Sequence, residues 1–178
     1  MINHIDDQVG HLTQFMMAKG VFQDTLILFT SDHGEMLGDH NLFRKTFAYE
    51  GSARIPFFAR APKSWNFPPE VVLDTPVGLQ DIMPTFLETA KVPVPESTTG
   101  SSLLPLMRND TGGWRECLHG EHAGCYNYED GLHFLTDGHW KYLWYSQTGV
   151  EQLFDLVSDP NEMCQIAGSE STQAQLET

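Results

Sequence analysis

Basic side chains are scarce in this sequence. Lys and Arg together number 10 against 24 Asp and Glu, which gives a formal net charge of -14 at pH 7. Such a surface repels the phosphates of nucleic acids and of anionic lipid membranes. We therefore expect no nucleic-acid partner and no membrane partner. An anionic small molecule can still bind where a few of the cations gather at one site.

Cysteine is scarce as well, and long apolar runs are missing. The three cysteines, Cys117, Cys125 and Cys164, form no CxxC pair and leave an odd one over, which argues against a disulfide framework and a zinc ribbon. No run approaches the roughly 18 apolar residues of a membrane-spanning helix. The first ten residues carry two carboxylates where a signal peptide has a basic and an apolar region. These absences leave the compartment open.

The composition that is present predicts a folded α/β protein. With 178 residues, 40% hydrophobic and 11% aromatic, the chain can bury the core of one domain with or without a small appendage. Helical spacing of apolar residues predicts a helix over 2–19 that ends before Gly20. The run TLILFT, 25–30, favours a strand that is buried on both faces of a parallel sheet.

The middle of the chain predicts more elements of the same class. Runs at 55–62 (IPFFARAP) and 71–77 (VVLDTPV) are typical of strands, and 79–90 returns to helical spacing despite Pro84. Residues 92–113 are rich in Pro, Ser, Thr and Gly, which indicates a long surface connection or a domain boundary.

The last third changes character to short aromatic segments separated by turn residues, as an antiparallel sheet requires. We expect four strands within 117–123, 132–138, 139–146 and 151–156. A turn and a short helix are expected after Asp155. The predicted division is therefore an α/β part over 1–113 and a small antiparallel β subdomain with its tail over 114–178.

A candidate site follows the strand at 25–30, where Asp32, His33 and Gly34 stand next to each other. Ligands of open α/β sheets collect at the carboxyl ends of strands. A carboxylate oxygen and an imidazole nitrogen can both face one cation there, and Gly34 permits a sharp exit of the backbone. The alternative is that Asp32 caps the next turn and that His33 is a surface histidine.

Lys45 is the next candidate, because an ammonium near a cation adds a second positive point for a sulfate or a phosphate. A lysine in a loop can equally be solvated, and Arg44 would serve as well if only charge mattered. His40 is a candidate for extending the site, or for a hydrogen bond to a neighbour.

The segment CLHGEHAGCYNY, 117–128, holds candidate substrate-binding residues: His119, Glu121 and His122. In a strand His119 and Glu121 share one face while His122 points to the other, so a local zinc site of all three requires a bend. The aromatic run at 139–145 favours sheet packing over a sugar-binding platform, because alternation alone explains it.

The pattern SDHGEMLGDHNLFRK, followed by TFAYEG and RIPFF, resembles the sulfatases of the alkaline phosphatase superfamily, in the branch that has Asp-His and includes choline sulfatases and phosphonate monoester hydrolases. Further similar segments are HIDDQVGHL, LQDIMPTFLETA, GSSLLPLM and HWKYLWYSQTGVEQLFDLVSDPNE. The resemblance covers essentially the whole chain. It implies the carboxyl-terminal part of an alkaline phosphatase-like sandwich, mostly parallel sheet with flanking helices, followed by a small antiparallel β subdomain.

The resemblance also implies roles for individual residues. Asp32 and His33 match metal ligands, and Lys45 matches the lysine that contacts the sulfate ester and stabilises the leaving oxygen. His40 is a weaker match to a catalytic substrate contact. Ca2+ is the usual cation of such sites, but a nitrogen ligand from His33 keeps Mn2+, Mg2+ and Zn2+ open.

The sequence departs from the family pattern at the nucleophile. Sulfatases make a formylglycine from Cys or Ser in a Cys/Ser-x-Pro-x-Arg motif, and neither residue begins such a motif here. We therefore expect the later half of a sulfuric ester hydrolase, inactive alone, whose partners are its amino-terminal half and a sulfate ester small molecule or sulfated glycan. The alternatives are a phosphonate or phosphate ester hydrolase of the same superfamily and a non-catalytic remnant.

Overall fold

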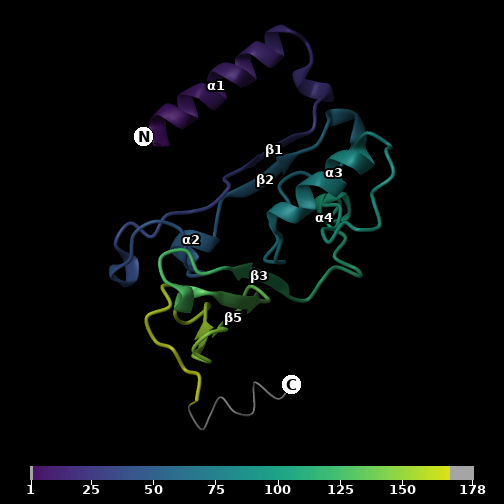
Figure 1. The fold of residues 1–178 in the computed structure, drawn as a ribbon. Helices are drawn as coiled ribbons and strands as arrows, with labels where there is room; N and C mark the ends of the chain where they lie inside the picture. Colours follow the sequence, from purple (N-terminus) through teal and green to yellow (C-terminus); the bar gives the residue numbers. More distant parts are fainter. Residues whose placement is uncertain (1, 169–178) are drawn as a thin grey trace.

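A computed structural model describes residues 2–168 of the chain, and Figure 1 shows its arrangement. The first part contains α1 (Ile2–Ala18), β1 (Ile27–Thr30), α2 (Glu50–Ala53), β2 (Phe57–Arg60), α3 (Ile82–Thr89) and α4 (Leu104–Met107). The second part contains β3 (Leu118–His122), β4 (Leu132–Thr136), β5 (Trp140–Tyr145) and β6 (Glu151–Asp155). In Figure 1 helix α1 lies along one end of the molecule and the sheet that contains β3 and β5 lies at the other. Among residues 2–168 no helix has both the length and the apolar character needed to cross a membrane.

The α/β class with a small antiparallel sheet is confirmed, with one difference in strand pairing. β1 and β2 pair antiparallel, with Ile27 opposite Arg60 and Thr30 opposite Phe57. Residues 2–168 therefore form no parallel sheet of their own. The prediction that 25–30 is buried on both faces is also wrong for this part of the chain, because every residue of β1 is only partly buried.

The predicted strand at 71–77 is wrong. This segment has no regular secondary structure, and Val72 is 89% exposed. Pro76 has no N–H to donate to a neighbouring strand, and its carbonyl instead accepts a hydrogen bond from the indole of Trp114 at 3.0 Å. Apolar residues alone therefore do not make a strand here.

The predicted helix at 79–90 is confirmed, as a short 3-10 turn at Leu79–Asp81 that continues into α3. Pro84 is the third residue of α3, where the first N–H groups of a helix have no carbonyl partner, so its missing N–H costs no hydrogen bond. Asp81 is fully buried and binds Arg115 through two hydrogen bonds, which ties α3 to the chain just before β3.

The four predicted strands of the last third are confirmed as one antiparallel sheet in the order β3-β4-β5-β6. Residues 156–168 form turns and bends, and the rest of the predicted tail helix lies outside the described residues. The division at residue 113 stays a prediction.

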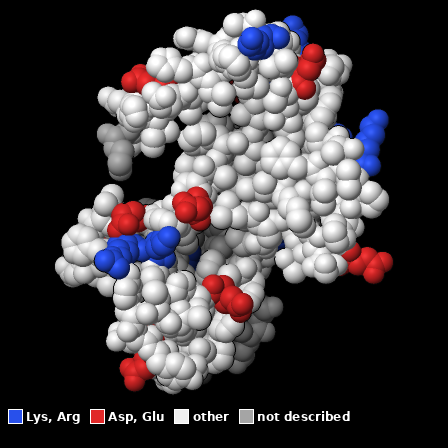
Figure 2. All heavy atoms as spheres, turned by 45° about the horizontal axis from the view of Figure 1, so that its top comes forward, with Lys and Arg blue, Asp and Glu red and all other residues white. Residues whose placement is uncertain are grey.

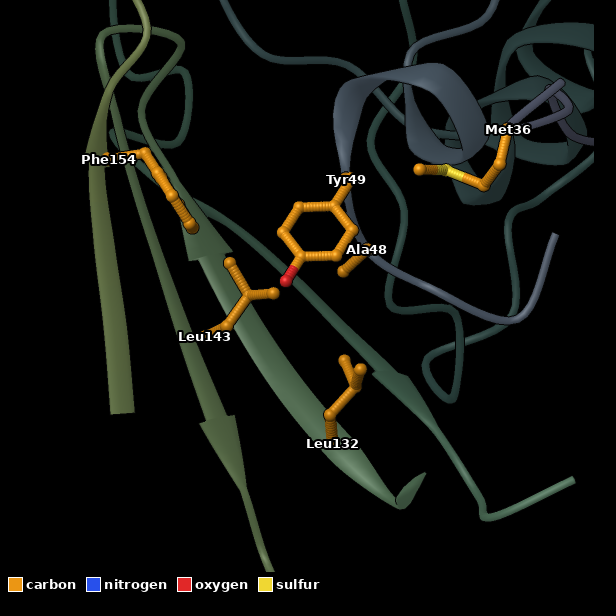
Figure 3. Close-up of a cluster of buried hydrophobic side chains, with 6 residues drawn as sticks. All are labelled: Met36, Ala48, Tyr49, Leu132, Leu143 and Phe154. Atoms are coloured by element: carbon orange, nitrogen blue, oxygen red, sulfur yellow. The ribbon is translucent and has the colours of Figure 1, made fainter. Parts of the chain in front are cut away.

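The main core lies where the inner face of this sheet meets the loops of the first part. Leu132, Leu143 and Phe154 come from β4, β5 and β6, and they cluster with Met36, Ala48 and Tyr49 (Figure 3). The Tyr49 hydroxyl donates a hydrogen bond to Gln152 at 2.9 Å. Of the aromatic residues at 139–145, Tyr145 packs against this cluster, whereas Trp144 is 40% exposed.

A lysine is buried in the same face. Lys141 of β5 is 1% exposed, and its ammonium pairs with Glu50 of α2 at 2.5 Å and with Glu162 at 2.9 Å. The second oxygen of Glu162 accepts the backbone N–H of Glu50 at 2.6 Å. This charged group joins the sheet, α2 and the segment after β6.

The opposite end of the molecule exposes apolar surface. No residue of α1 is buried, and its apolar positions Val9, Leu12 and Phe15 are 40 to 60% exposed. Phe58 of β2 stacks on Phe29 of β1 and is still 59% exposed. Figure 2 shows one face of the molecule, much of it free of Lys, Arg, Asp and Glu despite the net charge of -14. Several exposed large apolar side chains on α1 and β2 are typical of an interaction face.

Candidate functional site

Backbone hydrogen bonds fold the segment after β1 against α2 and the loop that precedes it. The N–H of Gly34 donates to Ser52 at 2.8 Å and that of Glu35 donates to Gly51 at 2.8 Å. The N–H of Met36 donates to Arg44 at 3.0 Å. These bonds bring Lys45 close to Asp32 and His33, although Lys45 follows His33 by twelve positions.

Gly34 makes this close approach possible. A Cβ built at Gly34 would lie 2.2 Å from the carbonyl oxygen of Gly51, which is backbone and cannot rotate away. We expect Gly34→Ala to lower the free energy of unfolding by about 1–3 kcal/mol, as overpacking does, and to displace His33 from Lys45. Urea denaturation of the folded protein measures the loss.

Gly10 in α1 provides the matched control, since a Cβ there meets nothing within 4 Å. Gly10→Ala is expected to raise stability by about 1 kcal/mol or less through helix propensity. Equal effects of the two substitutions would contradict the steric argument.

His33 has a defined tautomer. Its Nδ1 lies 2.7 Å from the carbonyl oxygen of Gly34, and because a carbonyl only accepts, Nδ1 carries the proton. The lone pair is therefore on Nε2, which faces the ammonium of Lys45 at 2.6 Å and the Oδ2 of Asp32 at 3.4 Å. A histidine whose other nitrogen donates to a backbone carbonyl has the arrangement typical of metal-binding histidines.

The Asp32 carboxylate contacts both the backbone and the imidazole of His33. Its Oδ1 accepts the backbone N–H of His33 at 3.0 Å, while Oδ2 points toward His33 Nε2. The Asp32 side chain is 83% exposed and that of His33 35%, so both side chains are accessible from solvent. A carboxylate oxygen and an imidazole lone pair that converge in this way fit two ligands of a divalent cation.

Lys45 is held at its backbone, and its side chain reaches His33. Its carbonyl accepts a hydrogen bond from the buried Ser52 hydroxyl at 2.8 Å, whereas the side chain is exposed apart from its contact with His33. The two predicted metal ligands and the predicted sulfate-contacting lysine therefore lie together. Their roles stay predictions.

Arg44 and Tyr126 form a neighbouring pair that the sequence did not indicate. The Arg44 guanidinium donates to the Tyr126 hydroxyl at 3.0 Å and lies 5.6 Å from the centre of its ring. The hydrogen bond with Tyr126 raises the pKa of Arg44. Tyr126 lies in the segment 117–128, and this contact brings that segment to the residue next to Lys45.

His40 is engaged in structural contacts. It has a left-handed backbone, with φ of 53°, in a 3-10 turn. Its ring stacks on Tyr49 with centroids 4.2 Å apart, and its Nε2 lies 3.0 Å from the carbonyl oxygen of Asn161. The predicted catalytic contact of His40 stays a prediction, and its observed contacts link the turn to Tyr49 and to the segment after β6.

The candidate residues of β3 are on opposite faces of the sheet, as the alternation predicts. His119 and Glu121 are exposed, and His133 of β4 joins them. His122 lies on the other face, where its Nδ1 is buried with no hydrogen-bond partner among the described residues. The three predicted substrate-binding residues therefore do not meet at one point, and their substrate-binding role stays a prediction.

Comparison with known proteins identifies the family of this chain. A family model described as N-sulphoglucosamine sulphohydrolase, C-terminal, matches residues 38–178. An arylsulfatase of Clostridium perfringens is 41% identical over 177 residues, which are 99% of this chain and 36% of that protein. The chain thus spans about a third of the length of the curated relatives it matches.

Solved structures have the same fold. The phosphonate monoester hydrolase of Agrobacterium radiobacter is 28% identical with a TM-score of 0.85, over 98% of this chain and 37% of that one. A protein solved in complex with its substrate D-glucosamine-2-N,6-O-disulfate is 25% identical with a TM-score of 0.83, over 99% of this chain and 36% of that one.

Proposed function

The chain belongs to the N-sulphoglucosamine sulphohydrolase C-terminal family of the sulfatases, and from that membership we propose that it forms the later part of the catalytic unit of a sulfuric ester hydrolase. The observation that carries the proposal is the convergence of Asp32 Oδ2 and Lys45 Nζ on the Nε2 lone pair of His33. A cation on these two ligands and the nearby ammonium would together neutralise the negative charge of a sulfate ester.

In this proposal Asp32 and His33 hold a divalent cation. The tautomer of His33 supports this role, because it leaves the lone pair on Nε2, where a cation would replace the contact with the Lys45 ammonium. When bound, the cation polarises the sulfate oxygens and favours the deprotonated form of the nucleophile. We propose Ca2+ as the cation, with Mn2+, Mg2+ and Zn2+ as alternatives. Among these four ions Zn2+ is the one that an imidazole nitrogen suits best.

Lys45 neutralises charge on the substrate. Once His33 Nε2 serves as a ligand, its lone pair no longer accepts from the ammonium of Lys45. The ammonium then faces the sulfate and offsets the negative charge that grows on the bridging oxygen as the alcohol leaves. Ser52 supports this role by fixing the backbone of Lys45.

The nucleophile comes from residues that precede this chain in the complete protein, as a formylglycine. The exposed apolar side chains of α1 and β2, Val9, Leu12, Phe15 and Phe58, support a partner surface of that kind, and we propose that the amino-terminal half covers them. The chain spans 36% of the arylsulfatase of Clostridium perfringens, which leaves ample length for such a half.

The substrate class is a sulfate ester small molecule or a sulfated glycan. The relative solved with D-glucosamine-2-N,6-O-disulfate supports a sulfated sugar. Arg44 and Tyr126 lie beside Lys45 and offer a cation and an aromatic hydroxyl to the alcohol part of the ester.

A phosphonate or phosphate ester hydrolase is the second candidate, because the phosphonate monoester hydrolase of Agrobacterium radiobacter shares the fold at 28% identity.

The test is the complete protein assayed against an aryl sulfate and an aryl phosphonate monoester of the same alcohol. We expect the sulfate ester to have the higher kcat/KM, and the isolated 178-residue chain to cleave neither.

A higher kcat/KM for the phosphonate would overturn the sulfatase assignment while keeping the superfamily. Cleavage of neither ester by a folded complete protein would favour a remnant without catalysis. Activity of the isolated chain would contradict the assignment of the nucleophile to preceding residues.

A further inference from the structure

Three metal-ligating side chains meet on the outer face of the four-stranded sheet. His119 and Glu121 are two residues apart in β3, so they project from the same face. His133 of β4 is directly opposite Glu121 in the strand register and diagonal to His119. The cluster therefore rests on two hydrogen-bonded strands, which are more rigid supports than loops.

The ligand atoms already have the separations of a coordination shell. His119 Nε2 lies 3.2 Å from His133 Nδ1, and Glu121 Oε2 lies 3.7 Å from the same nitrogen. All three ligand atoms fall within 4.8 Å of one another. With metal–ligand bonds of about 2.0–2.1 Å, two tetrahedral ligands lie roughly 3.3 Å apart, close to the two shorter separations.

The surroundings orient the two imidazoles. The His119 and His133 rings are nearly parallel, with centroids 5.5 Å apart, and His133 stacks in turn on Trp144 of β5 at 5.6 Å. The hollow beside them is lined by Trp144, Tyr142 and Glu151, which adds a second carboxylate. Stacking limits ring rotation, and the carboxylates favour a cation.

We propose that His119, Glu121 and His133 form a binding site for a divalent transition metal of the zinc class. Two imidazole nitrogens and one carboxylate oxygen are a ligand set that Zn2+ prefers, and three protein ligands leave a fourth position for water or an external group. The site contains none of Asp32, His33 and Lys45, so metal binding there can be tested separately from ester hydrolysis, although His119 and Glu121 are also predicted substrate-binding residues.

A simple hydrogen bond between the two histidines explains less of the arrangement. It accounts for the 3.2 Å contact of His119 and His133, whereas Glu121, at 3.7 Å from the same nitrogen, needs a separate ion pair with a charged His133. A shared cation accounts for all three positions at once.

The test is titration of the complete protein with Zn2+ in a calorimeter, on an Asp32→Ala background that removes one ligand of the proposed catalytic cation. We expect the Asp32→Ala protein to bind one equivalent of Zn2+ at the proposed site. His133→Ala and the isosteric variant Glu121→Gln, each made in the Asp32→Ala protein, should abolish this binding or weaken its affinity at least about 10- to 100-fold. His139→Ala is the matched control, because His139 pairs with Asp155 at 3.1 Å on the same sheet and is outside the cluster.

A spectroscopic readout locates the ion. Bound Cu2+ quenches nearby tryptophan, so we expect fluorescence quenching that excess Zn2+ reverses and that Trp144→Phe removes.

Zn2+ binding that is equally strong in His133→Ala, Glu121→Gln and His139→Ala, or no Zn2+ binding at all, would overturn the proposal. Circular dichroism spectra that match among the variants exclude unfolding as the cause of a loss.

Discussion

Lys45→Ala in the complete protein should lower kcat for sulfate ester hydrolysis by about 100- to 1,000-fold, the usual cost of removing one electrostatic stabiliser of a developing negative charge. The ammonium lies 2.6 Å from His33 Nε2, so the substitution removes the cation closest to the proposed ligands. We expect a much smaller change in KM, because charge on the bridging oxygen is largest in the transition state. Steady-state kinetics with an aryl sulfate measure both constants.

Lys63→Ala is the matched control, since Lys63 is an exposed lysine in a short 3-10 turn far along the chain from the site residues. Its kcat should equal that of the unaltered protein. Lys45→Arg should recover only part of the activity, because a planar guanidinium does not replace a compact ammonium. If Lys45→Ala and Lys63→Ala gave the same kcat, Lys45 would have no role in the reaction.

Lys141→Met should destabilise the fold by about 3–5 kcal/mol, the typical cost of removing one partner of a buried ion pair. Lys141 and Glu162 are each 1% exposed at their side chains, and Glu50 is 21% exposed. Without the ammonium, two carboxylates remain close together in a buried place. The free energy of unfolding from urea denaturation measures the loss.

Replacing Lys141, Glu50 and Glu162 together tests whether unpaired charge causes the loss of stability. In the triple variant Lys141→Met, Glu50→Gln and Glu162→Gln no charge remains, so we expect most of the lost stability to return. A triple variant as unstable as Lys141→Met would mean that the methionine packs badly and that charge has no part. Lys63→Met should leave stability within about 0.5 kcal/mol, as surface substitutions do.

The predicted elements differ in how well local sequence defined them. Helix α1, helix α3 and the strands β3 to β6 follow from apolar spacing and turn residues, and the structure has them. The segment 71–77 is equally apolar but forms no strand, since a strand also needs a partner for its backbone groups and Pro76 removes one donor. Pairing is a property of two segments, and one segment does not encode it.

Some residues of the candidate site were predicted from the sequence, and others were found only in the structure. Asp32, His33 and Lys45 were indicated by residue type and by resemblance to sulfatases, and the structure brings them together. The contact between Arg44 and Tyr126 joins residues 82 positions apart, and no local pattern signals it. His133 was likewise missed, because only strand register places it opposite Glu121.

The sequence by itself determined the family, the alternation of the last four strands and the residue types at the candidate site, because these depend on neighbours along the chain. Only the tertiary structure decided which of the alternating strand positions are buried and which face a common point. It buried Lys141 between Glu50 and Glu162, and it placed His119, Glu121 and His133 around one point on the outer face. The physical reason is that burial and coordination depend on distances between side chains from separate elements, and packing sets those distances.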